Sequence, residues 1–313
     1  MGTNLARQCG MDVSADGLPA MVQTGHTTQV TQLTQVTQVR DYPISIAWPT
    51  AAESAALQSV TACRREAQAR WSLPPHGKLI LGVDRFDYTK GIMERLHAFE
   101  HLLDTQPQWQ GAVRFVQVAA PTRTDLKDYA DFQSQVRSEV TRINAKFSDT
   151  FTADGHAPVV LLDSHHDRTS LDTLYRAADV CLVTSLHDGM NLVCKEFVSV
   201  RDDGRGVLVL SQFAGAANEL SRALFVNPYH VVQVADTLHQ ALSMPAAEQQ
   251  QRMRALRATV KVANVYRWAA TMLLDAAALR APAPHRSVRP QLVPPRSRPA
   301  SAGTPGEARM ASV

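Results

Sequence analysis

The chain has 313 residues, and its 32 lysines and arginines against 29 aspartates and glutamates leave a formal charge of only +3. So small an excess gives no support to nucleic-acid binding. No apolar run approaches the ~20 residues of a membrane span, and no secretory signal pattern opens the sequence. Four cysteines without metal or pairing motifs favour a reducing compartment, so we expect a cytoplasmic protein; they are Cys9, Cys63, Cys181 and Cys194.

The two ends of the chain differ in composition from its middle. Residues 1–41 are polar, with a Thr-Gln repeat over residues 27–39. Alternation in the repeat is compatible with a strand, but low complexity favours a disordered or irregular lead-in. Residues 281–313 are rich in Pro, Arg, Ser and Ala, which predicts a disordered tail. One globular domain is therefore expected over residues 42–280.

Within this domain, short apolar runs alternate with stretches of helical spacing. Apolar runs of this length, bounded by polar residues, predict buried strands. Their alternation with helices predicts a Rossmann-like parallel sheet with helices on both faces. The expected strands cover residues 79–83, 113–118, 159–162, 180–184, 207–210 and 224–226. The expected helices cover residues 92–103, about 125–145, 171–177, 192–200 and 215–220, and residues 231–272 are nearly all compatible with helix.

Two strand–loop–helix junctions carry the charged residues of a candidate ligand site. The loop after the first expected strand holds Arg85 and Lys90, and the turn after the fourth holds Asp188, with Glu196 in the helix that follows. Ligands of open α/β sheets bind beyond the carboxyl ends of the strands. A helix N-terminus and two cations there suit a diphosphate, and the two acids can accept hydrogen bonds from hydroxyls. The pattern indicates a nucleotide-sugar site, although such junctions also occur as plain structure and such charges as solvated side chains.

Three ordered strings resemble the trehalose-6-phosphate synthase family. They are G-V-D-R-F-D-Y-T-K-G at residues 82–91, T-S-L-H-D-G-M-N-L-V-C-K-E-F-V at 184–198 and V-L-V-L-S-Q-F-A-G-A-A-N-E-L at 207–220. The similarity covers residues 42–274, which correspond to only the C-terminal, donor-binding half of that family with its closing helices. It implies one Rossmann-like half of a GT-B glycosyltransferase. Such an enzyme transfers glucose from UDP-glucose to glucose 6-phosphate with retention, without a metal or cofactor.

The resemblance also implies a role for each matched residue of the donor site. Arg85 and Lys90 match the pair that grips the donor diphosphate, and with Asp188 they are the candidate catalytic residues. The turn along the donor's glucose and phosphates corresponds to Asp188, Gly189, Met190 and Asn191. The segment that holds the nucleotide through its backbone and a carboxylate on the ribose corresponds to Leu192, Val193, Cys194, Lys195 and Glu196.

Two further positions match ligand contacts, and a third departs from the family. His166 occupies the position that contacts the uracil, where phenylalanine is common. Arg123 matches an arginine that reaches the acceptor's phosphate. His187 stands where many members carry arginine, so one cation near the donor is missing. The resemblance implies front-face attack by the acceptor hydroxyl, because no carboxylate in these strings is placed as a nucleophile.

Other candidate constellations have simpler explanations. No G-x-x-x-x-G-K-[ST] or G-x-G-x-x-G motif is present, so ATPase and dinucleotide-binding hypotheses lack support. Asp84 and Asp87 are expected to pair with the cations of their own loop rather than with a metal. His165, His166 and Asp167 are adjacent, and no further ligand is spaced to complete a metal site with them. We therefore expect no metal site.

The sequence leaves the activity of this chain open, because a half of about 100–200 residues with most acceptor contacts is expected before residue 42. The first hypothesis is a trehalose-6-phosphate synthase-like enzyme that lacks this half. The second is a non-catalytic nucleotide-sugar-binding or regulatory module. The third is a related glycosyltransferase such as a glucosylglycerol-phosphate synthase. An apolar stripe in the closing helices predicts self-association or a partner domain; it comprises Val260, Val265, Trp268 and Met272.

Overall fold

The computed structural model describes residues 27–32, 35–151 and 157–280. The Thr-Gln repeat forms two antiparallel strands, β1 (Thr27–Gln32) and β2 (Gln35–Arg40). Thr and Val, whose β-branched side chains favour strands, make up most of the repeat. Residues 27–32 and 35–40 therefore form strands, which the sequence had left as one possibility, rather than an irregular lead-in. The rest of the predicted lead-in and the predicted tail lie outside the described residues, and the domain limits stay a prediction.

Six parallel strands form the main sheet, in the order β5-β4-β3-β6-β7-β8. They are β3 (Lys78–Arg85), β4 (Val113–Ala120), β5 (Val159–Leu162), β6 (Val180–Val183), β7 (Val207–Ser211) and β8 (Leu224–Val226). The first three strands are added outward from β3 and the last three outward from β6, so the direction of winding reverses between these two. In doubly wound sheets of this order the ligand crevice lies at the point of reversal.

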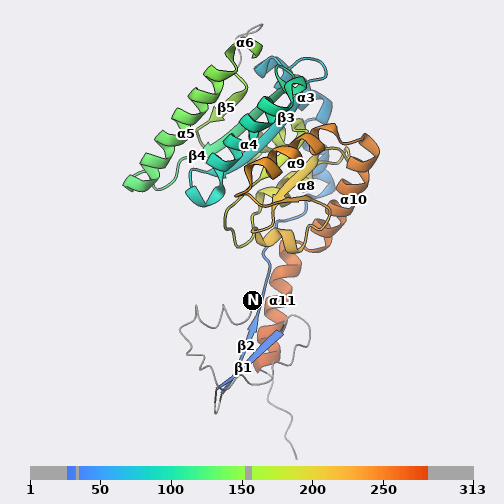
Figure 1. Ribbon diagram of the computed structural model, residues 1–313. Helices are drawn as coiled ribbons and strands as arrows, with labels where there is room; N and C mark the ends of the chain where they lie inside the picture. Colours follow the sequence, from blue (N-terminus) through green and yellow to red (C-terminus); the bar gives the residue numbers. More distant parts are fainter. Residues whose placement is uncertain (1–26, 33–34, 152–156, 281–313) are drawn as a thin grey trace, which may run out of the picture. The chain divides into compact units, whose positions relative to one another are not determined.

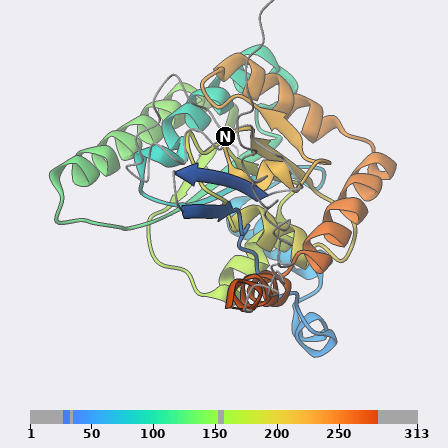
Figure 2. The same cartoon turned by 90° about the horizontal axis from the view of Figure 1, so that it is seen from below.

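Helices cover both faces of this sheet, as both views show (Figure 1; Figure 2). One face packs against α4 (Ile92–Thr105), α5 (Lys127–Lys146) and α9 (Val231–Ser243). The other packs against α3 (Val60–Trp71), α7 (Arg168–Ala177), α8 (Val193–Val200) and α10 (Ala246–Val262). Because both faces are buried, the strands read as continuous apolar runs. The shorter elements are α2 (Ala51–Ala56), α6 (Ser148–Phe151) and the 3₁₀ turns η1 (Tyr88–Lys90), η2 (Pro107–Trp109) and η4 (Gly215–Asn218).

An extended segment at residues 42–46 is held against two helices. Three of its carbonyls, at alternate residues, accept hydrogen bonds from α8 and from α11 (Val265–Arg280). The pairs are Tyr42 with Trp268 Nε1 (3.1 Å), Ile44 with Lys195 Nζ (3.1 Å) and Ile46 with the Val265 amide (2.9 Å). The compact unit that contains these contacts ends at Leu273, within α11. We refer to residues 42–273 as the lobe.

The predicted fold class is confirmed, with all six expected strands present, but the helices differ from the prediction at two places. Helix α3 was not expected, because its buried residues are mostly small and leave a faint apolar stripe; they are Cys63, Ala67 and Trp71. The helix expected at residues 215–220 is the single turn η4. The stretch 231–272 is nearly all helical, as predicted, and consists of three helices with breaks before Ala246 and Val265. None of the described helices is both long and apolar enough to span a membrane.

Candidate functional site

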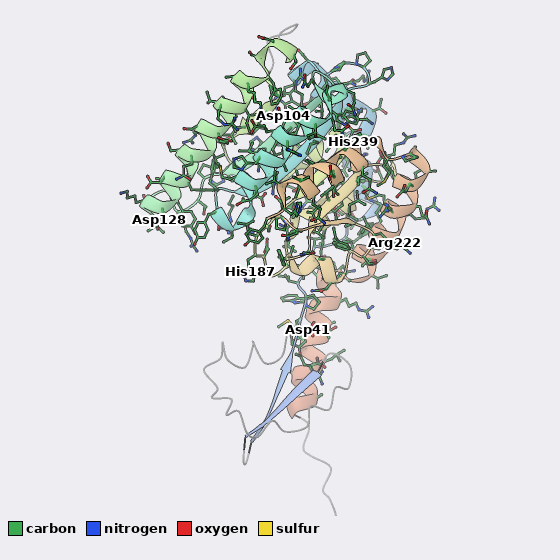
Figure 3. The ribbon with its side chains drawn as sticks, viewed as in Figure 1. Asp41, Asp104, Asp128, His187, Arg222 and His239 are labelled. Atoms are coloured by element: carbon green, nitrogen blue, oxygen red, sulfur yellow. The ribbon has the colours of Figure 1, made fainter. Side chains whose placement is uncertain are left out.

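A cleft of about 450 Å³ lies at the carboxyl ends of β3 and β6, at the point where the sheet reverses. In Figure 3, Asp104, in the last turn of α4, lies well above His187, which is in the loop after β6 on the side of the cleft. Nine of the predicted site residues line the cleft, eight of them from the two junctions and His166 from the loop before α7. They are Arg85, Lys90, His166, Asp188, Met190, Asn191, Leu192, Val193 and Glu196.

The two loops that form the cleft are hydrogen-bonded to each other. The Leu186 amide donates to the Thr89 carbonyl (2.8 Å), and the Thr184 hydroxyl donates to the Gly91 carbonyl (3.1 Å). Gly91 has φ of 65°, and a Cβ there would lie 2.2 Å from the Thr184 carbonyl oxygen. Only glycine fits this contact without displacing the backbone. The loop after β3 is therefore fixed against the end of β6.

Lys90, predicted to grip the donor diphosphate, and Asp188, predicted to lie along the glucose and phosphates, form an ion pair across the two loops. Lys90 Nζ lies 2.7 Å from Asp188 Oδ2, and both side chains are largely buried. Burial opposes ionisation of Asp188, but hydrogen bonds from Lys90 and Asn191 outweigh it and hold its pKa below the usual value. Arg85 is different, because its side chain is 55% exposed at the rim of the cleft, 3.7 Å from Asp87.

Arg95, which the sequence did not single out, lies beneath both loops. Its guanidinium is fully buried and donates to Asp84 (2.8 Å), to Thr184 Oγ1 (3.0 Å) and to the Lys90 carbonyl (3.3 Å). The expected pairing of Asp84 with a cation of its own loop is therefore wrong, because that carboxylate points inward to α4. Asp87 instead caps η1 by accepting from the Thr89 amide and faces Arg85, as expected. The single guanidinium of Arg95 therefore joins the end of β3 to the end of β6.

The turn after β6 is shaped by Asn191, which has φ of 77°. Asn191 Oδ1 accepts from the Cys194 amide (3.2 Å), which satisfies a donor in the first turn of α8. The turn rests on the β7–η4 loop, because the Gly215 amide donates to the Asp188 carbonyl (3.0 Å). A Cβ on Gly215 would lie 2.0 Å from the Gly189 carbonyl oxygen. Small residues after β7 therefore allow two loops to touch beside the cleft.

Glu196, in the first turn of α8, has both carboxylate oxygens engaged. The Tyr175 hydroxyl donates to Oε2 (3.0 Å), and Arg168 Nη1 lies 3.1 Å from Oε1. Tyr175 lines the cleft with Glu196 and was also missed from the sequence, where it reads as an ordinary core aromatic.

Four predicted site residues do not line this cleft. Gly189 is exposed, and Cys194 is fully buried, where burial raises the pKa of its thiol to about 12. Lys195 points away from the cleft, with Nζ 2.9 Å from Glu219 and bonded to the Ile44 carbonyl. Arg123 stacks on the Tyr129 ring and donates to its hydroxyl (2.9 Å). Gly189, Cys194 and Lys195 could therefore contribute to this cleft only through backbone atoms.

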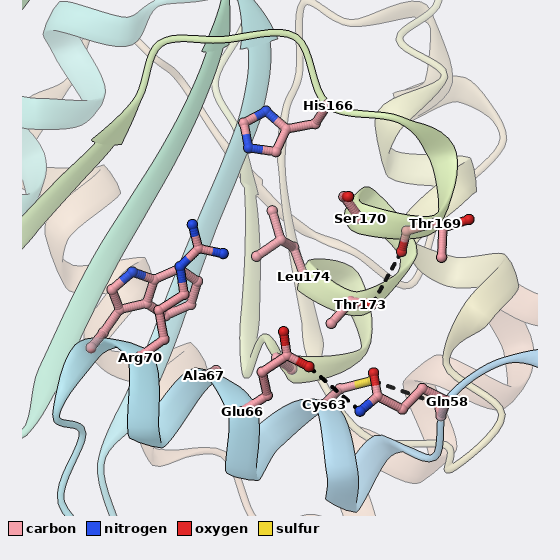
Figure 4. A pocket seen from close by; sticks show the side chains of 12 residues that line it. Gln58, Cys63, Glu66, Ala67, Arg70, His166, Thr169, Ser170, Thr173 and Leu174 are labelled. Atoms are coloured by element: carbon pink, nitrogen blue, oxygen red, sulfur yellow. Dashed lines mark hydrogen bonds between the residues drawn. The ribbon is translucent and has the colours of Figure 1, made fainter.

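His166 separates the cleft from a second hollow of about 430 Å³ between α3 and α7 (Figure 4). Its Nδ1 lies 2.9 Å from the Ser164 carbonyl, which favours the tautomer protonated at Nδ1. The second hollow has polar walls that include Glu66, Arg70 and Ser170. His166 therefore lines both the cleft and the second hollow. Within the described residues, no three His, Cys, Asp or Glu side chains gather as a metal-ligand group.

The fold and the cleft define one Rossmann-like half of a GT-B glycosyltransferase, with its crevice at the sheet's reversal point. A family model provides the particular family. The chain belongs to glycosyltransferase family 20, whose model matches residues 11–278.

Curated relatives are trehalose-6-phosphate synthases. The chain is 43% identical over 201 residues to that of Sodalis glossinidius, covering 64% of this chain and 42% of the relative. It is 45% identical over 197 residues to that of Citrobacter koseri, covering 63% and 41%. The chain therefore spans less than half the length of these relatives.

Solved structures with the same fold include complexes. One is an alpha,alpha-trehalose-phosphate synthase (UDP-forming) from Burkholderia xenovorans in complex with glucose-6-phosphate, with a TM-score of 0.72 and 38% identity over 81% of this chain and 55% of that chain. Another, from E. coli, is bound with UDP-2-fluoro glucose and has a TM-score of 0.72 and 37% identity, over 81% and 54%. At these identities the likeness extends beyond the fold to the sequence.

Proposed function

We propose that the cleft binds UDP-glucose and that this chain is the donor half of a trehalose-6-phosphate synthase. The observation that carries the proposal is that Arg85, Lys90 and the first turn of α8 all line one cleft. Cations and a helix N-terminus at a sheet's reversal point suit a diphosphate. The solved relatives with glucose-6-phosphate and UDP-2-fluoro glucose support the same substrates here.

In the proposed reaction the bond between the anomeric carbon and the UDP oxygen breaks while the acceptor hydroxyl forms a new bond on the same face. The hydroxyl proton passes to the departing phosphate oxygen. Arg85 and Lys90 stabilise the charge that develops on UDP, with the backbone amides at the start of α8. Asp188 accepts hydrogen bonds from the glucose hydroxyls once Lys90 has turned from it to the diphosphate. His166 contacts the base, and Glu196 the ribose.

Transfer also requires an acceptor site, which this chain supplies only in part. Arg123 is the proposed contact for the acceptor phosphate. Positioning two reactants can contribute ~7–11 kcal/mol, and one arginine cannot orient a hexose. We therefore propose that the chain alone turns over slowly and pairs with a partner domain or with itself. The exposed Tyr266 and Leu273 of α11 lie beside the predicted stripe, in which Val260 proves to be buried and Met272 exposed. The free, buried thiols fit the proposed cytoplasmic setting.

Calorimetric titration with UDP tests the donor site. We expect the Arg85→Ala/Lys90→Ala variant to bind UDP about 100-fold more weakly, by analogy with the loss of preorganised charge-stabilising donors. The matched control is Arg254→Ala/Lys261→Ala, which removes the same two charge types from exposed positions on α10. Equal UDP affinities for the site variant and the control would contradict the proposal.

A non-catalytic nucleotide-sugar-binding module is the second candidate, because such a module needs only the donor cleft. Measuring UDP release from UDP-glucose with and without glucose 6-phosphate separates the two. An enzyme releases UDP faster with the acceptor, whereas a binding module does not respond. Replacing glucose 6-phosphate by glycerol 3-phosphate tests the related glycosyltransferase in the same assay.

A further inference from the structure

The carboxylate of Glu196 is held on two sides by groups from α7. Tyr175 donates its hydroxyl to Oε2 at 3.0 Å, and the Arg168 guanidinium pairs with Oε1 at 3.1 Å. Each contact therefore reaches a different oxygen. Glu196 and Tyr175 line the cleft, whereas Arg168 approaches from outside its lining.

This arrangement leaves a matched pair of acceptor positions. A carboxylate has about four lone-pair sites, two on each oxygen. Tyr175 takes up one site on Oε2 and the Arg168 charge lies against Oε1, so at least one site remains on each oxygen. Two acceptors side by side on one carboxylate suit two donors on adjacent carbons. The cis-diol of a ribose presents such a pair, whereas a 2′-deoxyribose presents only one donor.

The two α7 groups are themselves fixed. Tyr175 is fully buried, its ring packs edge-on against Phe197, and burial raises the pKa of its phenol well above the usual value. The phenol therefore stays protonated and donates. Arg168 is braced from the other side, because its Nε donates to Asp172 at 2.8 Å, one helical turn along α7. Neither group needs to reorganise when a ligand arrives.

We propose that Tyr175 and Arg168 are positioning residues that orient Glu196 to recognise the cis-diol of a ribose, so that the cleft selects ribonucleotides over 2′-deoxyribonucleotides. The inference rests on the proposed function, because it requires a nucleotide in this cleft. It goes further in assigning sugar selectivity to two residues of α7 that need not touch the ligand. In a glutamate without these partners, the carboxylate would rotate and its two free acceptors would lose their alignment.

The test compares UDP with 2′-deoxy-UDP by calorimetric titration of the full chain. We expect the wild type to prefer UDP by about tenfold, the effect of one hydrogen bond to a charged group. Tyr175→Phe and Arg168→Met should each reduce this preference at least threefold and leave 2′-deoxy-UDP affinity nearly unchanged. Tyr266→Phe and Arg254→Met, which alter the same residue types at exposed positions on α11 and α10, should keep the full preference.

Each outcome bears on the inference. A preference that stays intact in both site variants, or an equal loss of affinity for both nucleotides, overturns the positioning role while leaving UDP binding in place. A wild type that binds neither nucleotide overturns the proposed function and this inference together. Thermal unfolding monitors the fold of each variant. If the buried Tyr175→Phe does not fold, the half-exposed Arg168→Met decides the question alone.

Discussion

Replacing Arg95 by methionine should destabilise the lobe strongly and in a pH-dependent way. The ion pair of Arg95 with Asp84 is buried, with side chains 0% and 3% exposed. Removing one partner of such a pair costs about 3–5 kcal/mol, because the other charge is left without compensation. That is a large share of the 5–15 kcal/mol by which domains are typically stable. Gln117 and Thr184 also lose their donor.

The pH dependence follows from Asp84. Burial raises the pKa of this carboxyl, and Arg95 opposes the rise. Without Arg95 the folded-state pKa of Asp84 rises further above its unfolded value. Stability of the variant is then greatest below the unfolded-state pKa of Asp84 and falls as the pH rises from there through the folded-state pKa. We expect the loss in Arg95→Met to be smaller at pH 5.5 than at pH 8.

Urea unfolding at both pH values measures this loss. The double variant Arg95→Met/Asp84→Asn should regain at least about 1 kcal/mol relative to Arg95→Met at pH 8, because no buried charge remains. Arg254→Met, at an exposed position on α10, is the control and should change stability by less than about 0.5 kcal/mol. A loss below 1 kcal/mol in Arg95→Met, or the same loss at both pH values, would refute the reasoning.

Two further predictions concern the turn beside the cleft and the surface between α4 and α5. Gly215→Ala should weaken UDP binding at least tenfold in calorimetry, because its Cβ would displace the Gly189 carbonyl; unchanged affinity would mean that the turn yields freely. Hydrogen bonding to Arg142, helped by Lys146, lowers the pKa of Glu100 to about 2. Glu100→Gln should therefore lower the free energy of unfolding at pH 7 by about 1–2 kcal/mol in urea unfolding, a loss kept small because both cations are half-exposed. The difference from the wild type should vanish as the pH falls from about 4.5 towards 2, because Glu100 becomes protonated. A constant difference across that range would exclude the ion pair as its source.

The strands of the main sheet were predictable because each is an apolar run buried on both faces. The cleft was predictable in outline for a related reason. Parallel strands place their carboxyl ends at one edge, so Lys90 and Asp188 had to meet once the first and fourth strands lay side by side. What the sequence could not provide was the pairing itself, because a lysine and an aspartate 98 positions apart carry no local signal of contact.

Residues that act from below the cleft escaped the sequence analysis. Arg95 lies in a helix of mixed composition, where a cation normally indicates a solvated face. Its burial depends on an ion pair with Asp84, which is on the strand β3. Tyr175 resembles any aromatic of an amphipathic helix, and only its distance to Glu196 distinguishes it. The direction of the Lys195 side chain was equally hidden, since Val193 and Glu196 close to it in the chain both line the cleft. Such roles arise from tertiary contacts rather than from local pattern.

The extended segment at residues 42–46 has a consequence for engineering. Because the Tyr42 carbonyl is bonded to Trp268 and the Ile46 carbonyl to Val265, the chain enters and leaves the lobe at one place. A folded unit whose ends meet can be inserted into a surface loop of another protein or circularly permuted with a short linker. The lobe is therefore suited to transfer as a single cassette that carries its cleft with it.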